Sequence, residues 1–163
     1  MNTKEALKAG IDGGGFVANA YLADLTDADL LVRPAPDCNH IAWQLGHLIA
    51  AEHQMVEGAC PGSMPNLPDG FAEKHTKESA KSDNPGDFCS KEEYLNAAKE
   101  QRAGTFAALE KLSDADLDKP APEAMRSYCP NVGSIFTMQG THWMMHAGQW
   151  AIIRRKLGKP PLF

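Results

Sequence analysis

The sequence lacks the features that would place the chain in a membrane or on a nucleic acid. No apolar run approaches the roughly 18 residues that a membrane-spanning helix needs. The 163 residues include 16 Lys and Arg against 21 Asp and Glu, so the formal net charge is −5. A nucleic-acid-binding surface is basic, and this balance opposes one. We therefore expect neither a membrane nor a nucleic acid as a partner.

Closely spaced cysteines are also absent. Cys38, Cys60, Cys89 and Cys129 lie too far apart in the sequence for a redox CxxC pair or a thiolate zinc cage, and we interpret them as reduced thiols. Residues 1–10 have no apolar segment of the kind found in signal peptides. Together these features predict a cytoplasmic protein.

The short alternating runs typical of β-strands are missing, whereas helical periodicity is widespread. Apolar stripes, capping residues and breakers predict four long helices, at residues 3–24, 39–58, 90–111 and 131–157. A chain of this length has the size of one domain, so we expect residues 1–163 to form a single all-α four-helix bundle.

The first predicted helix contains three consecutive glycines, Gly13 to Gly15. Each glycine inside a helix costs on the order of 0.5 to 1 kcal/mol, so packing must hold this segment together or the helix breaks there. Close approach of another backbone and a loose joint are both compatible with such a run.

A long connection separates the second and third predicted helices. It covers residues 59–90 and is rich in Pro, Gly, Ser and charge. Neighbouring antiparallel helices are usually joined by about 2 to 8 residues, so a connection of about 30 predicts a crossover between two parallel helices. Part of it is a candidate lid over a site. His75 within it is expected to be solvated.

Two similar phrases follow the first and third predicted helices. Residues 25–36 read LTDADLLVRPAP, and residues 112–122 read LSDADLDKPAP. Similar phrases in corresponding places predict two related halves, each consisting of helix, linker and helix. Convergent loop chemistry is the alternative, because a hydroxyl residue followed by acidic residues often starts a short helix and Pro-Ala-Pro often ends one.

The last predicted helix carries the pattern most directly connected with chemistry. His142 and His146 are one helical turn apart, and Gln149 lies on the same stripe. Two imidazoles so placed can bind one metal ion. There is no HExxH motif, so no general base is evident. Gln149 is a candidate catalytic residue that orients bound water or substrate, and an ordinary core hydrogen bond is the alternative.

A third imidazole is available on the second predicted helix. His47 lies mid-way along it, at a depth comparable to that of the pair, whereas His40 and His53 lie elsewhere on the helical wheel. Three imidazoles without a fourth side chain are typical of a catalytic zinc-type site. A hydrogen-bonded core histidine at position 47 remains the alternative. The Glu-x-x-His motif of di-iron bundles is absent, which excludes that class.

The order of these motifs resembles the DinB/YfiT-like family of metal-binding four-helix bundles. The phrase WQLGHLIAAE contains His47, and HWMMHAGQWAIIRRKLGKPP begins at His142. The resemblance spans nearly the whole chain and implies an up-down-down-up bundle, often a homodimer. It also implies that a divalent metal is held by His47, His142 and His146. One departure is Ala147, since the residue after the second histidine is often basic in the family.

The resemblance also implies a function. Relatives include transferases that use low-molecular-weight thiols such as bacillithiol or mycothiol. Our leading hypothesis is therefore a metal-dependent enzyme for a small-molecule substrate, either a bacillithiol-, mycothiol- or glutathione-type S-transferase or a hydrolase. Zinc or nickel is the favoured metal, and imidazole also suits iron and cobalt. The alternatives are a non-catalytic, stress-related bundle that binds a metal or small ligand, and a metal-free dimeric scaffold.

Overall fold

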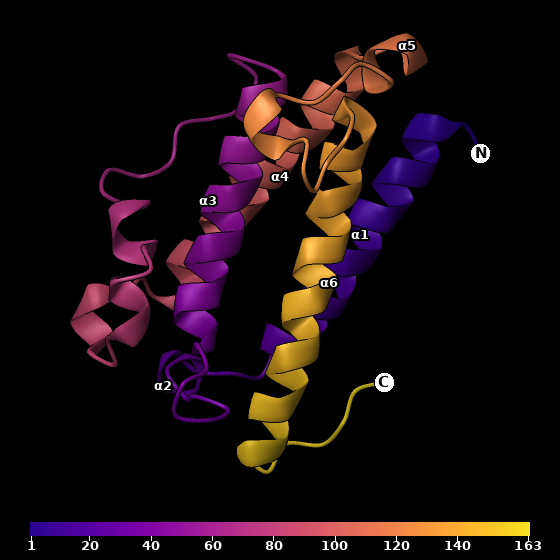
Figure 1. Ribbon diagram of the computed structural model, residues 1–163. Coiled ribbons are helices and arrows are strands. Elements are labelled where there is room, and N and C mark those ends of the chain that lie inside the picture. Colours follow the sequence, from indigo (N-terminus) through magenta and orange to yellow (C-terminus); the bar gives the residue numbers. More distant parts are fainter.

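The computed structural model describes residues 1–163 and contains helices but no β-strand (Figure 1). Its frame consists of four long helices. Two of them, α3 and α6, form one layer, with α1 and α4 behind them. The long helices are α1 (Thr3–Leu22), α3 (Ile41–Ala59), α4 (Lys91–Lys111) and α6 (Val132–Lys156).

The directions of the four helices confirm the up-down-down-up bundle. Helices α1 and α6 run one way, and α3 and α4 run the other way (Figure 1). The predicted parallel pair is therefore α3 and α4, joined by the long connection. No helix combines the length and apolar character needed to cross a lipid bilayer.

The two repeated phrases adopt the same local structure. Each forms a one-turn helix, α2 (Asp27–Leu30) or α5 (Asp114–Leu117), that begins with a capping box. In both, the cap hydroxyl accepts the backbone N–H of the third helical residue, whose carboxylate accepts the N–H of the cap residue. The chain therefore runs twice through long helix, one-turn helix and long helix, as two related halves require.

Glycines allow α1 and α6 to pack backbone against backbone. A Cβ atom at Gly14 would overlap the backbone of Gly140, and a Cβ at Gly140 would overlap the backbone of Gly10. Helix α1 continues without a break through Gly13, Gly14 and Gly15. The structure therefore shows close approach of another backbone, at Gly14, and not a loose joint in the helix.

The long connection contains three short 3₁₀ helices and is fixed to the bundle by His75. The prediction of a solvated His75 was wrong, because this side chain is only 6% exposed. Its Nδ1 donates to the Phe71 carbonyl at 2.7 Å, and its Nε2 accepts the Tyr94 hydroxyl at 2.7 Å. Gly46 of α3 leaves room for the ring, since a Cβ there would overlap it. The 3₁₀ helices are η1 (Glu73–His75), η2 (Ser79–Lys81) and η3 (Pro85–Asp87), and a fourth, η4 (Glu123–Met125), precedes α6.

Candidate metal centre

The three predicted histidines meet between α3 and α6. His47 comes from α3, and His142 and His146 come from α6. The ring centroids of His47 and His142 are 5.1 Å apart, those of His47 and His146 are 5.6 Å apart, and those of His142 and His146 are 4.9 Å apart. One ligand nitrogen from each ring can be chosen so that all three lie within 4.8 Å of one another. Three ligand atoms this close together could hold a single ion.

Gln44 holds the His146 ring in the form that a metal ligand needs. Its Oε1 accepts His146 Nδ1–H at 2.9 Å and Trp150 Nε1–H at 2.8 Å. Its Nε2 donates to the Asn39 carbonyl at 2.6 Å, which fixes the orientation of the amide because a carbonyl can only accept. His146 therefore carries its proton on Nδ1, and the electron pair of Nε2 is free for a metal.

Trp43 supports His47, the predicted ligand on α3. Its ring lies parallel to that of His47, with an interplanar angle of 4° and centroids 5.1 Å apart. The indole Nε1–H donates to the Thr76 carbonyl at 2.8 Å, so the long connection holds Trp43 in place. Trp43 therefore contacts a predicted ligand directly, whereas Trp150 acts through Gln44.

The electrostatic setting keeps all three imidazoles neutral. Burial lowers the pKa of His47, and burial together with the neighbouring rings lowers the pKa of His142 and of His146 to about 4. The cluster contains no carboxylate, which would favour the protonated form of the rings. Neutral imidazole is the form that binds a metal, so the donor set fits a divalent transition-metal ion.

Gln149, the candidate catalytic residue, is exposed on α6. Burial is the larger effect on the pKa of His146 and lowers it, whereas the side chain of Gln149 raises it. A catalytic role for Gln149 stays a prediction. Ala147, where the chain departs from the family pattern, is fully buried in the main core cluster. Its side chain therefore packs in the core.

The other histidines have structural partners of their own. His40 caps α3, with Nδ1 accepting Trp43 N–H at 3.1 Å and Nε2–H donating to the Ser82 carbonyl at 3.1 Å. His53 pairs with the side chain of Gln101 at 3.1 Å. Neither joins the triad, as the helical wheel predicted.

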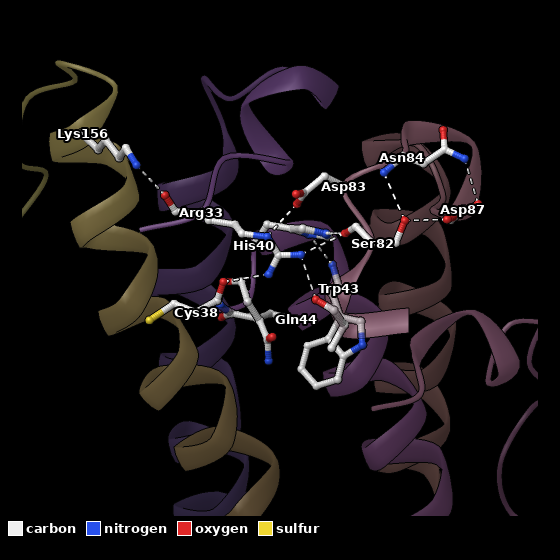
Figure 2. Close-up of polar contacts among 12 residues, drawn as sticks. Arg33, Cys38, His40, Trp43, Gln44, Ser82, Asp83, Asn84, Asp87 and Lys156 are labelled. Atoms are coloured by element: carbon white, nitrogen blue, oxygen red, sulfur yellow. Dashed lines mark hydrogen bonds and ion pairs between the residues drawn. The ribbon is translucent and has the colours of Figure 1, made fainter. Parts of the chain in front are cut away.

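Arg33 ties the start of α3 to the long connection, and sequence reasoning did not single it out (Figure 2). Its guanidinium donates to Asp83 Oδ1 at 2.6 Å and to the carbonyls of Cys38, Ala80 and Ser82. Figure 2 shows Arg33, Cys38, Ser82 and Asp83 around His40 and Gln44 at the start of α3. The segment around Asn39, whose carbonyl orients Gln44, is therefore fixed on one side by Arg33 and on the other by His40.

An ion pair with a buried carboxylate connects α3 to α4 and α6. Glu52 is only 1% exposed, and its carboxylate accepts Arg102 Nη2–H at 2.9 Å, the Thr105 hydroxyl at 2.7 Å and Trp143 Nε1–H at 3.2 Å. Burial raises the pKa of Glu52, while Arg102 opposes that shift. Trp143 directly follows His142, so this pair helps to set the position of α6 against α3.

The sequence model of one protein family, the DinB superfamily, matches residues 17–150. The chain belongs to the DinB superfamily. The match begins within α1, ends at Trp150 and includes all three histidines of the cluster. No curated protein and no solved structure matches this DinB protein. Family membership and the three-histidine cluster together fit a metal-dependent protein.

Proposed function

We propose that this DinB protein binds one divalent metal ion through His47, His142 and His146 and uses it in an enzymatic reaction on a small molecule. The observation that carries the proposal is the set of three neutral imidazoles with ligand atoms within 4.8 Å, one of them already fixed in its ligand tautomer by Gln44. When bound, such an ion supplies Lewis acidity and lowers the pKa of a coordinated thiol or water.

Thiol transfer is the leading reaction. Three imidazoles and one exchangeable position accommodate a thiol without a dedicated side-chain base, and the cluster contains no carboxylate that could act as one. Trp43 and Gln149 stand next to the ligands and would contact or orient the substrate. Zinc or nickel is the favoured ion, with iron and cobalt as further candidates. Metal-dependent hydrolysis is the second reaction of the same site.

Metal content is the first test. Protein purified without a histidine tag should contain about one equivalent of metal after loading with zinc or nickel. The combined replacement of His47, His142 and His146 by Ala should abolish this binding. Unchanged metal content in the triple variant would refute the proposed site and favour the metal-free scaffold.

A second test separates an enzyme from a non-catalytic metal-binding protein. We expect the loaded protein to conjugate bacillithiol, mycothiol or glutathione to an electrophile such as monobromobimane, and His146→Ala to abolish turnover while circular dichroism stays unchanged. Metal binding without conjugation or hydrolysis would favour the non-catalytic binder.

Homodimer formation is a further part of the proposal. Large apolar side chains are exposed on α1, on α6 and at the carboxyl end of the chain, and self-association would cover them. Sedimentation equilibrium should give twice the mass of the chain, and a monomer mass would refute this. The exposed side chains are Phe16, Met144, Met145, Ile152, Leu162 and Phe163.

A further inference from the structure

Helices α3 and α6 carry the same pair of polar residues at the same spacing. Gln44 precedes His47 by three positions on α3, and Gln139 precedes His142 by three positions on α6. Each residue of the first pair is 95 positions from its counterpart in the second (44 to 139, and 47 to 142). Both glutamines are fully buried. The two halves of the chain therefore resemble each other in the site as well as in the one-turn helices.

The contacts of the two glutamines are reciprocal. Gln44 bonds to Trp150 of α6, and Gln139 Nε2 lies 3.9 Å from Met55 Sδ of α3. Met55 and Trp150 are again 95 positions apart. Each glutamine also donates from Nε2 to a carbonyl about one turn earlier in its own chain segment, Asn39 or Ile135.

Reciprocal contacts of this kind indicate a two-fold axis. When such an axis is present and residue i contacts residue j, the counterpart of i contacts the counterpart of j. Helices α3 and α6 run in opposite directions, as a two-fold axis perpendicular to both helices requires (Figure 1). The axis relates His47 to His142, so the metal centre lies on or near it. The counterpart of His146 is then position 51, which holds alanine.

We infer that Ala51 takes the place of a fourth ligand, and that exchangeable ligands of the metal centre approach it past this side chain. Ala51 follows His47 by one turn, as His146 follows His142, and it is half-buried. A ligand residue at position 51 would complete a closed four-ligand site, whereas the alanine methyl leaves that direction open. The inference rests on the proposed metal site and identifies where its substrate enters.

The charge of the centre indicates the class of ligand that enters there. Three neutral imidazoles leave the full charge of a divalent ion uncompensated, so small anions and thiolates are favoured over cations. Alanine is smaller than any side chain that binds a metal, so the difference in volume would be available to one donor such as a thiol sulfur beside α3. The site should thus accept a low-molecular-weight thiol at the position next to Ala51.

The test adds the missing ligand. Ala51→His should bind Co²⁺ at least about tenfold more tightly than the unmodified chain, because a fourth imidazole replaces an exchangeable ligand. Gln139 would support the new ring as Gln44 supports His146. Azide and 2-mercaptoethanol should change the visible spectrum of the Co²⁺-loaded unmodified chain, and this response should be lost in Ala51→His. Ala50→His, about 100° further round the helix, is the matched control and should leave affinity and response unchanged.

A variant with a smaller side chain covers the case in which histidine does not fit at position 51. Ala51→Cys should give a thiolate-to-cobalt charge-transfer band in the near ultraviolet, and Ala50→Cys should not. A folded Ala51→His with unchanged affinity and retained azide response, or an Ala51→Cys without the band, would overturn the inference while leaving the three-histidine site intact. If the unmodified chain fails to bind Co²⁺, or the triple histidine variant binds it equally well, the metal site itself is wrong and the inference falls with it.

Discussion

At the scale of single residues, the metal centre depends on Gln44 as much as on the histidines. Its carbonyl oxygen is shared by His146 and Trp150, so replacing it leaves two buried N–H donors without an acceptor. We predict that Gln44→Leu weakens zinc binding by roughly 10- to 100-fold, the usual effect of losing such a supporting hydrogen bond. Competition titration against a chromophoric chelator measures this.

The matched variant is Gln44→Glu, which keeps an oxygen in position to accept from both donors. It should lose less zinc affinity than Gln44→Leu, because a carboxylate in this place makes the ligand imidazole more basic, although it cannot donate to the Asn39 carbonyl as Gln44 Nε2 does. Equal losses in both variants would mean that position 44 affects packing only, and the role assigned to its oxygen would be wrong.

Whether the sequence predicted a given site residue depends on the kind of signal that this residue leaves in the sequence. The pair His142 and His146 is visible from helical spacing, and His47 from its depth and the family resemblance. Gln44 was missed because its partners lie 102 and 106 positions away, and a glutamine in an apolar helix indicates nothing by itself. His75 was misjudged because the recess at Gly46 exists only after the connection has packed on α3.

At the scale of helices, the contact between α1 and α6 sets the shape of the bundle. A methyl group at Gly14 would collide with the Gly140 backbone, whereas one at Gly15 would meet nothing within 4 Å. We predict that Gly14→Ala lowers the free energy of unfolding by about 1 to 3 kcal/mol through overpacking. Gly15→Ala should raise it by about 0.5 to 1 kcal/mol through helix propensity.

Urea denaturation of the two variants measures both changes. A stabilised Gly14→Ala protein would show that α1 and α6 do not approach as closely as described. The comparison is informative because the two substitutions are chemically identical and one position apart.

The connection between α3 and α4 depends on the hydroxyl of Tyr94. This group donates to His75 Nε2 and accepts Cys89 N–H at 3.3 Å. Tyr94→Phe should therefore cost about 1 to 3 kcal/mol of unfolding free energy, since it leaves a buried imidazole nitrogen unpaired. Hydrogen exchange should also speed up in residues 71–89. Tyr128→Phe is the control and should change neither quantity, because Tyr128 is exposed.

The helices themselves were predictable because their signals are local. Periodic apolar residues, capping residues and breakers marked the four long helices, and the length of the connection implied that α3 and α4 are parallel. The short 3₁₀ helices inside the connection were not predicted, because three residues are too few for a periodic pattern. Helix α1 ends at Leu22 rather than at residue 24, which is within the usual error of helix ends.

At the scale of the whole molecule, metal binding and folding should be linked. The triad joins residues from α3 and α6, so it exists only in the folded chain and a bound metal must stabilise that state. At a free zinc concentration 100 times the dissociation constant, we predict a gain of about 2.7 kcal/mol in unfolding free energy. Chelation should reverse it. The triple histidine variant should show no gain, and an equal gain there would place the stabilising metal elsewhere.

The metal centre requires that His47, His142 and His146 together hold one ion. X-ray absorption spectroscopy of the zinc-loaded protein tests it most directly, because imidazole ligands give a distinctive scattering pattern and a zinc–nitrogen distance of about 2.0 to 2.1 Å. We predict three imidazole ligands in the unmodified chain and two in His146→Ala. A first shell made of sulfur or of carboxylate oxygens, or one unchanged by the loss of His146, would contradict the account.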